Sequence, residues 1–505
     1  MKNYLKYIFL IFALVIVSCD DGFDELNINK NAATALNPIF ILNNAVINAS
    51  YVSATVIYEV SIVQQMVTPN SGVLTGANYN QDNRDATNQT WIRYYRSVIR
   101  NTADAIVQTK DLPSRSNLTN MAKILQSFAF MILTDSYGDI PYFDASKGYT
   151  DQITLPKYDG QQAVYSDIIK VLTESTAALD ASKTIETADI LFGGDVAKWK
   201  KFGNSLLLRA GMRLAKVDAG LAQSTVQKAI AGGVITSNAD NAFTRHDANY
   251  VNGVGQMLNS TEAANFYIAA PFLDYLRKTS DPRMKAFAVR YVGAKSGPEQ
   301  TAAKANTDTS LQVGMPMGYD NNTIVKQAAD RGLASFYDFS QVDRTRFGKN
   351  TANMFFVTYS QTSLLIAEAI QRGWASGSAS DAYKAGIKAH MEECATHDAG
   401  SAIPAASIDA YLAANPFDAS KALEQINTQY WISSFLNGPE AFANYRRSGF
   451  PKLPPNPFPG KSIKGDFIKR LTYPNSEISV NNANVQAAVA RQGADDLDTK
   501  VWWDK

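Results

Sequence analysis

Apolar residues recur at three- and four-residue steps along much of the chain. From Leu118 to Ile132 the steps fall on Met121, Leu125 and Phe128, so one face of a helix would be apolar there. Strand-like alternation is scarce and short. Similar helical patterns lie at 39–66, 91–107, 165–179, 199–214, 363–371, 383–394 and 423–435. The pattern predicts a mostly α-helical fold with few short strands.

One pair of these segments indicates how the helices are joined. The helical run at 364–369 ends near Gly373 and Trp374, a turn rich in Ser and Gly follows, and a second helix begins at Ala382. Small residues such as Ala367 and Ala382 let two helices approach closely, as in tetratricopeptide-type hairpins. No repeat of fixed period is evident. We expect a tetratricopeptide-like scaffold of helical hairpins.

Long irregular stretches separate the helical segments, at 68–88, 240–261, 292–331 and 449–464. Loops of this length in a compact domain are usually functional or disordered. The last of the four is rich in proline, which predicts a stiff, extended segment that follows the surface. Its prolines are Pro451, Pro454, Pro455, Pro457 and Pro459.

The N-terminus has the features of a secretory signal. Lys2 and Lys6 precede an uninterrupted apolar run at 8–17. A run of ten residues reaches about 15 Å as a helix, roughly half of a hydrocarbon core, so it is too short to span a bilayer. No later stretch is expected to span one either.

The apolar run ends at Ser18 and Cys19, which resembles the lipobox at which bacterial prolipoproteins are cleaved and acylated on the cysteine. Several acyl chains on Cys19 would hold the protein on a membrane. The chain is therefore expected to divide into a lipoprotein signal peptide at 1–18, a lipidated tether at 19–37 and a single domain at 38–505.

Composition narrows the class of partner. The chain has 48 Lys and Arg against 47 Asp and Glu, and loss of Lys2 and Lys6 leaves a net charge of about −1. No basic excess is present to attract nucleic acid. Once Cys19 carries lipid, Cys394 has no partner for an internal disulfide. The 24 Tyr, 24 Phe and 6 Trp suit stacking on sugar rings or peptide side chains.

Motifs for covalent chemistry are weak. His390, Cys394 and His397 share a helical face and are groups that bind zinc, but residues seven apart lie about 10.5 Å apart along a helix, too far to share one ion. The Gly-Lys-Ser sequence at 460–462 has Pro455 where a phosphate-binding loop requires glycine. Neither His-Glu-x-x-His nor Gly-x-Ser-x-Gly occurs. We expect no metal, cofactor or catalytic residue, although paired carboxylates of a glycosidase cannot be recognised by spacing.

The sequence Leu-Thr-Asp-Ser-Tyr-Gly-Asp-Ile-Pro-Tyr stands at 133–142, where Gly138 would end the helix and Pro141 would prevent its continuation. It closely resembles a hallmark of the SusD/RagB-like nutrient-binding lipoproteins of the bacterial outer membrane, the starch-binding-associating SusD-like family. In itself it reads as a structural corner. Further matches follow in family order at 199–206, 281–283, 373–374, 437–442, 445–447, 470–474 and 501–505.

The resemblance covers nearly the whole chain and implies four tetratricopeptide-like hairpins, loops that carry the ligand site, and docking as a lid on a SusC-like TonB-dependent transporter. Family members bind oligosaccharides or, in some branches, peptides, and do no covalent chemistry. The acidic residues after Cys19 resemble an export signal, so we expect an outer-membrane protein, lipid-anchored and facing the cell exterior. These residues are Asp20, Asp21, Asp24 and Glu25.

We therefore expect a cell-surface lipoprotein that binds a nutrient, most simply an oligosaccharide, and hands it to the transporter. A peptide-binding member of the same family is the main alternative. A glycan-degrading enzyme and a helical-repeat adaptor are further ones.

A sugar site needs flat aromatic faces together with amide or guanidinium groups. Loops are the expected carriers because helix faces are needed for packing. Trp502 and Trp503, at the chain end, are expected to pin the tail to the core. The expected ligand-binding residues are Tyr79, Asn80, Asn83, Arg84, Trp91, Tyr250, Asn252 and Tyr319.

Overall fold

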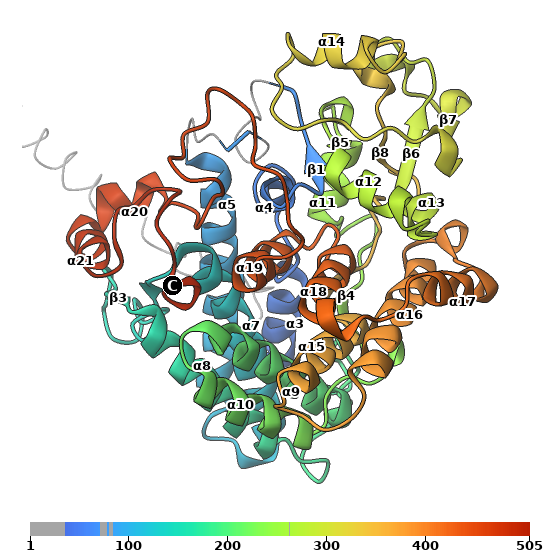
Figure 1. Cartoon of the computed structure of the whole chain (residues 1–505). Coiled ribbons are helices and arrows are strands. Elements are labelled where there is room, and N and C mark those ends of the chain that lie inside the picture. The colour runs from blue at the N-terminus through green and yellow to red at the C-terminus, as the bar shows by residue number, and fades with distance from the viewer. Residues whose placement is uncertain (1–35, 71–77, 80–83, 262) are drawn as a thin grey trace, which may run out of the picture. The chain divides into compact units, whose positions relative to one another are not determined.

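Helix α7 (Ser116–Tyr137) covers the segment with the clearest apolar period (Figure 1). In this computed structural model, which describes residues 36–70, 78–79, 84–261 and 263–505, α7 is buried along most of its length. Leu118, Met121 and Leu125 have no exposed surface, as the period predicts. Pro38–Lys505 forms one compact unit.

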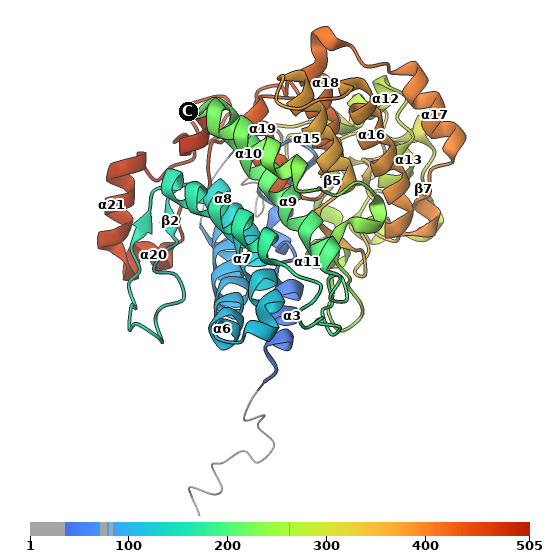
Figure 2. The ribbon, with the colours of Figure 1, turned by 90° about the horizontal axis from the view of Figure 1, so that it is seen from below.

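Helices that follow one another in sequence pack against one another in the first half of the chain (Figure 2). Helix α6 contacts α7, α7 contacts α8, α8 contacts α9, and α9 contacts α10. This is the arrangement of helical hairpins that the sequence predicts. The elements are α3 (Pro38–Asn48), α5 (Asp85–Arg93), η3 (Tyr94–Ile99), α6 (Arg100–Thr109), α8 (Gln161–Ala178), α9 (Val196–Arg213) and α10 (Ala219–Ala231).

The C-terminal helices form a second group. Helices α15 (Tyr359–Gln371) and α16 (Ala379–His397) make the hairpin expected from the sequence, and the small residues Ala367 and Ala369 are fully buried in α15. Helix α18 packs on α15 and on α19. The remaining helices are α17 (Ala405–Ala414), α18 (Ala422–Ser433), α19 (Gly438–Ser448), α20 (Asn475–Val480) and α21 (Asn482–Gln492).

Short helices and strands lie in the segments that connect the longer helices, most of them between α10 and α15. The strands pair as β1 with β5, β2 with β3, β4 with β9, and β7-β6-β8. The helices are α4 (Glu59–Ile62), α11 (Gly253–Asn259), α12 (Ala270–Lys278), α13 (Arg283–Phe287) and α14 (Ile324–Ala329). The strands are β1 (Met66–Val67), β2 (Ile140–Pro141), β3 (Tyr158–Asp159), β4 (Ala242–Thr244), β5 (Tyr267–Ile268), β6 (Ala288–Tyr291), β7 (Ala305–Asn306), β8 (Gln341–Val342) and β9 (Met354–Val357).

The motif at 133–142 forms a corner at the end of α7. Gly138 has a φ of 81°, a conformation that favours glycine, and its N–H donates to the Thr134 carbonyl oxygen at 2.8 Å. Tyr137 is fully buried. Asp139 accepts the backbone N–H of Gln161 at 2.9 Å, which joins the corner to the start of α8. These contacts give the motif a structural role.

The mostly helical fold with few short strands is confirmed. One predicted helix is wrong, because the segment 39–66 is not continuous. Helix α3 ends at Asn48, and the chain then turns through η1 (Ser53–Val56) and α4 into β1. Nearly all of this stretch is buried, so apolar residues continue through the turns and hide the break.

The same stretch also passes a simple test for membrane-spanning helices. Within the described ranges, Pro38–Val56 is the one candidate that is long and apolar enough, although the sequence led us to expect none. Of its apolar window, 67% is buried inside the protein. The segment is also interrupted between α3 and η1, so we assign it to the core.

Candidate ligand-binding site

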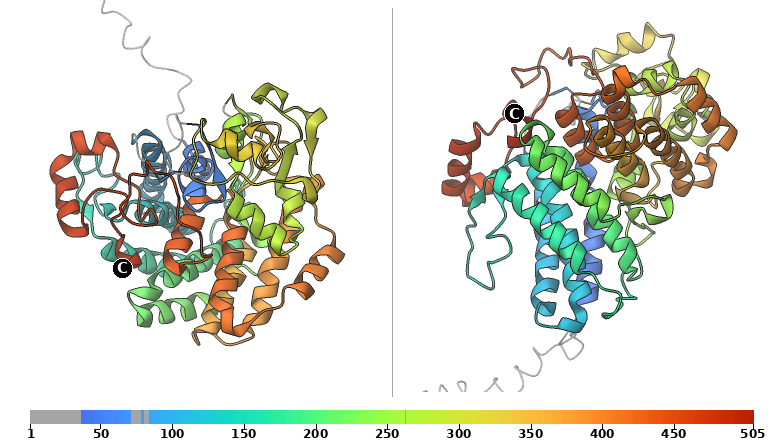
Figure 3. Two further views of the ribbon diagram at one scale, coloured as in Figure 1. Left: turned by 45° about the horizontal axis from the view of Figure 1, so that its top comes forward. Right: turned by 60° about the horizontal axis from the view of Figure 1, so that its bottom comes forward.

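Three of the four long loops predicted from the sequence meet on one side of the protein. Asn78 Nδ2 donates to the Tyr319 carbonyl oxygen at 3.1 Å, which joins the first loop to the third. Gly318 lies so close to the fourth loop that a Cβ there would be 2.4 Å from the Pro457 ring. We call the surface formed by residues 316–319 and 451–462, beneath which Asn78 and Tyr79 are buried, the loop face (Figure 3, left).

A groove of about 550 Å³ lies on the loop face. Helix α12 lines one part of it and the proline-rich segment another, and Trp431 of α18 contributes as well. This volume falls in the range of small-molecule sites, about 300–1,000 Å³. We call it the proline groove; it is lined by Ala270, Pro271, Asp274, Tyr275, Lys278, Pro316, Met317, Trp431, Pro451, Lys452, Leu453, Pro454, Pro455 and Pro457.

Two buried glutamines hold the parts of the groove together. Gln64 Nε2 donates to the Pro454 carbonyl oxygen at 2.7 Å, and Gln65 Nε2 donates to the Trp431 carbonyl oxygen at 2.7 Å. The Trp431 indole N–H in turn donates to Val63 at 3.0 Å. Gln64 has a φ of 55°, a backbone conformation that residues other than glycine rarely adopt. Such a conformation persists where the surroundings fix it.

The lining combines apolar walls with a few charges. Tyr275 is half-buried, and burial raises the pKa of its hydroxyl, so that the group stays a neutral O–H. Asp274, Lys278 and Lys452 are exposed, and Asp274 pairs with Arg277 at 2.7 Å. An aromatic ring with polar neighbours can stack on a pyranose and bind its hydroxyls. Among the described residues, the lining contains one carboxylate, Asp274.

Two of the aromatic residues expected to stack on ligand are buried. Tyr79 is 0% exposed, its hydroxyl donates to Ile62 at 3.1 Å, and its ring packs edge-on against Phe467 at 5.3 Å. Trp91 is 5% exposed and packs against Tyr137 at 5.1 Å. Neither ring has a free face. The structure therefore does not support direct stacking by Tyr79 or Trp91, because both rings fill the core.

Two of the expected polar residues are engaged within the fold. Arg84 forms an ion pair with Asp495. Asn252 is buried at the start of α11, where its Oδ1 accepts the Gly255 N–H at 3.0 Å and its Nδ2 donates to Ala352 at 2.9 Å. The polar atoms of both residues thus make hydrogen bonds within the protein, and their contact with a ligand stays a prediction.

Tyr319 and Tyr250 keep exposed surface. Tyr319 is half-buried and follows the lining residue Met317 by two positions, but it does not itself line the proline groove. Tyr250 is 57% exposed and does not line the groove. Ligand contact by either residue stays a prediction. Three of the expected residues, Asn80, Asn83 and the lipidation site Cys19, lie outside the described residues.

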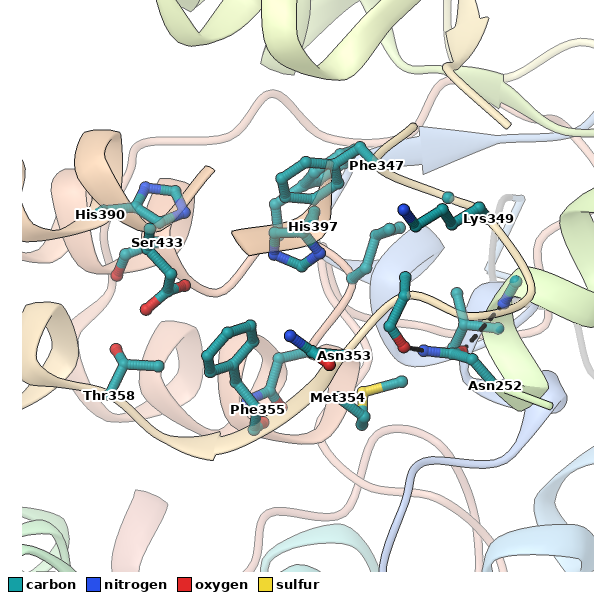
Figure 4. A pocket seen from close by; sticks show the side chains of 18 of the residues that line it. Asn252, Phe347, Lys349, Asn353, Met354, Phe355, Thr358, His390, His397 and Ser433 are labelled. Carbon is teal, nitrogen blue, oxygen red and sulfur yellow. Dashed lines mark hydrogen bonds between the residues drawn. The ribbon is translucent and has the colours of Figure 1, made fainter. Parts of the chain in front are cut away.

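A smaller cavity of about 40 Å³ lies between α16 and the segment 347–355 (Figure 4). His390, Glu393 and His397 line it. The His397 ring stacks on Phe347 with centroids 4.0 Å apart, and burial lowers the pKa of His397 to about 3. The volume admits a few water molecules and is too small for a sugar ring.

The helix that carries these histidines also carries Cys394, the thiol considered above. Its Sγ donates to the His390 carbonyl oxygen at 3.4 Å, and burial raises the pKa of the thiol. A raised pKa opposes formation of a nucleophilic thiolate. In the part of the chain that the structure describes, no three His, Cys, Asp or Glu side chains come together as a metal site.

Residues 30–474 match the SusD-like family described as starch-binding associating with outer membrane. The chain belongs to the SusD-like family. This SusD-like protein is 32% identical to a solved chitin-binding protein, with a TM-score of 0.81 over 93% of this chain and 100% of that one. It is 26% identical to a SusD-like protein titled Bacteroidetes AC2a, with the same TM-score and coverage. None of the curated proteins matches it.

A chitin-binding SusD homolog from Flavobacterium johnsoniae shares the fold. It is 23% identical, with a TM-score of 0.75 over 93% of this chain and 98% of that one. The family match confirms the resemblance drawn from the sequence and assigns the protein to an outer-membrane-associated family.

Sequence reasoning missed the residues that line the groove. Tyr275 and Trp431 lie in helices, where an aromatic residue is most simply explained by core packing. Met317 lies in a long loop without a distinctive neighbourhood. The clustered prolines were the available signal, because a stiff segment held against the surface makes a wall, but nothing in the sequence shows which helix faces it.

Proposed function

We propose that this SusD-like protein is a cell-surface lipoprotein that binds an oligosaccharide in the proline groove and passes it to a SusC-like TonB-dependent transporter. The observation that carries the proposal is the groove of about 550 Å³ that two long loops, α12 and Trp431 build on the loop face. Its family is described as starch-binding, which supports a carbohydrate ligand. The protein would act by binding alone.

For the ligand class we propose oligosaccharides of N-acetylglucosamine. The relative that is 32% identical is named a chitin-binding protein. An acetamido group adds a methyl to each sugar, and Met317 and the prolines offer apolar surface to receive it. The Tyr275 ring would stack on a pyranose, and Lys278 and Lys452 would donate hydrogen bonds to amide or hydroxyl oxygens.

Calorimetry with chito-oligosaccharides tests the proposal. Tyr275→Ala removes the stacking ring and should weaken binding by about 1–3 kcal/mol. Tyr149→Ala is a matched control, because Tyr149 is 93% exposed and does not line the groove. Unchanged affinity in a folded Tyr275→Ala variant would place the site elsewhere. Binding of malto-oligosaccharides without chito-oligosaccharides would overturn the ligand class.

Tyr319 is proposed as a ligand contact close in sequence to the lining residue Met317, Tyr250 as a contact outside the groove, and Asn80 and Asn83 as further contacts. Tyr319 is half-buried and packs against the hydrophobic cluster that includes Met315 and Met317. A longer oligosaccharide would extend past Met317 onto this ring. Tyr319→Ala should therefore weaken a hexasaccharide more than a disaccharide.

The membrane anchor is proposed at Cys19, with the protein facing the cell exterior. Metabolic labelling with palmitate should mark the parent protein, and Cys19→Ala should move it from the membrane to the soluble fraction. Protease added to intact cells should digest it. An unlabelled parent protein that stays with the membrane would contradict the anchor, and protection from the protease would contradict the orientation.

Association with the transporter and the lack of catalysis need separate tests. The protein should co-purify with the SusC-like barrel from native membranes in mild detergent. Recovery alone, with the barrel present, would count against the handover. Purified protein incubated with chito-oligosaccharides should release no new reducing ends, and their appearance would favour the glycosidase alternative.

A further inference from the structure

Exposed apolar side chains gather where the folded unit begins. Phe40, in the first turn of α3, is 51% exposed. Leu112 after α6, and Ile185 and Ile190 in the segment between α8 and α9, are also exposed. We call these four residues the tether-end patch.

Hydrogen bonds hold the segment 184–190 against α3 and against the turn after α6. Asn43 Nδ2 donates to the Ala188 carbonyl oxygen at 2.8 Å, and Asn43 Oδ1 accepts the Ile190 N–H at 3.2 Å. The Thr184 N–H donates to the Ser114 carbonyl oxygen at 3.0 Å. Phe40 lies one turn before Asn43 on the same face of α3. Ile190 and Phe40 are therefore neighbours.

The orientation of the helices brings Leu112 to the same place. Arg93 donates to Asn48 at 3.2 Å and Tyr94 donates to Ala49 at 2.9 Å, so the end of α3 lies beside the end of α5. The chain continues from α5 through η3 into α6. Helix α3 packs against both η3 and α6, so α3 and α6 run antiparallel. The start of α3 thus lies beside the end of α6, as Figure 2 shows.

Helix α3 exposes one large apolar side chain. Ile39, Leu42 and Val46 are buried against the core, while Phe40 and Asn44 are exposed. Exposed apolar side chains that gather in one place favour contact with a partner. The nearby exposed charges, Lys110, Asp111 and Lys183, are of mixed sign, so the partner would meet an apolar surface instead of a charged one.

We propose that the tether-end patch rests on the lipid bilayer to which the protein is anchored. The inference rests on the proposed acylation of Cys19. A tether of residues 19–37 reaches at most about 65 Å when fully extended, and it enters the folded unit at Pro38, within the patch. A slack tether brings this end to the lipid, and apolar side chains then enter the outer 5–10 Å or so of the interface. The contact would fix the orientation of the folded unit on the membrane.

A depth probe at single cysteines tests the proposal on the full, acylated protein. Cys394 is buried, so a cysteine placed on the surface can be labelled selectively. Phe40→Cys and Ile190→Cys would carry an environment-sensitive fluorophore, with the protein anchored in phosphatidylcholine vesicles that contain a lipid-borne quencher. Both labels should be quenched at least twofold more than a label at Tyr149→Cys, which is 93% exposed elsewhere on the protein.

Two results would overturn the contact while the anchor holds. In protein that floats with the vesicles, a label at Phe40→Cys that only an aqueous quencher reaches shows that this end stays in water. A label that neither quencher reaches shows that protein covers the patch, whether the transporter or another part of the chain.

A second measurement separates this inference from the anchor. The Cys19→Ala chain, without lipid, is mixed with the same vesicles at high lipid concentration. Replacement of Phe40 and Ile190 by Ser should lower its partition at least fivefold, with little change in melting temperature because both side chains are exposed. Equal partition with and without the two substitutions overturns the proposal even if Cys19 carries no lipid.

Discussion

The indole N–H of Trp503 donates to Asp135 Oδ1 at 2.8 Å, which ties the end of the chain to the end of α7. Asp135 also accepts the Tyr165 hydroxyl at 2.5 Å and Arg213 Nε at 3.1 Å. Trp503 is fully buried, as expected for a residue that pins the tail. The corner motif at 133–142 therefore anchors the C-terminal segment of the chain to the end of α7.

The first prediction concerns this carboxylate. Asp135→Ala leaves the buried Arg213 with one acidic partner, Glu440, and leaves two further donors unsatisfied. We expect a loss of about 3–5 kcal/mol in the free energy of unfolding, measured in urea. Asp409→Ala, at an exposed position of α17, is the control and should change little. Equal stability of the two variants would contradict the structural role of Asp135.

The second prediction is a loss of stability in acid that depends on Glu368. Burial alone would raise its pKa, but the guanidinium groups of Arg447 and Arg372 overcome this and lower the pKa to about 2, from an ordinary value of 4.5. As the pH falls, Glu368 therefore takes up its proton in the unfolded state before it does so in the folded state. The contribution of Glu368, about 3 kcal/mol, is present above pH 4.5 and is lost as the pH falls toward 2.

Urea unfolding of the parent protein and of Glu368→Gln at several pH values measures this contribution. The variant should be less stable at pH 7, and the difference from the parent should shrink between pH 4.5 and 2. A difference that stays constant across this window would show that Glu368 keeps an ordinary pKa.

The third prediction has the opposite sign and concerns Glu393. This carboxyl is buried in α16 with a hydrogen bond from Asn241, and burial raises its pKa to about 8. Between pH 4.5 and 8 the unfolded state loses the proton while the folded state keeps it. The contribution of Glu393 to stability is thus fully present below pH 4.5 and is lost as the pH rises through 8.

Glu393→Gln keeps the acceptor for Asn241 without the titrating proton. Relative to the parent protein, the variant should gain stability as the pH rises from 5 to 8, by a few kcal/mol at most. Thermal unfolding at these two pH values is sufficient. A relative stability that does not change with pH would mean that Glu393 is already ionised in the folded protein.

The helical scaffold was predictable because its signal is local. The period of α7 and the α15–α16 hairpin are set by residues three or four apart, and a helix face that is apolar in sequence is buried in the structure. The groove was not predictable, because Tyr275, Met317 and Pro454 come from segments that are far apart in the chain. The burial of Tyr79 was hidden for the same reason, since its partners Gln64 and Phe467 are identified only by the fold.

The last prediction separates packing from ligand binding at two tyrosines. Tyr79 is fully buried, its hydroxyl donates to the Ile62 carbonyl oxygen and its ring packs on Phe467, so Tyr79→Ala should lower the free energy of unfolding by about 3–5 kcal/mol. Tyr319 is half-buried, so Tyr319→Ala should cost roughly 1 kcal/mol or less. Calorimetry with a chito-oligosaccharide on folded protein should give the opposite order. Tyr319→Ala should weaken binding more than Tyr79→Ala, because Tyr319 is partly exposed and Tyr79 is not. Strong destabilisation by Tyr319→Ala with unchanged binding would assign Tyr319 to packing and move the ligand contact to a residue of the groove.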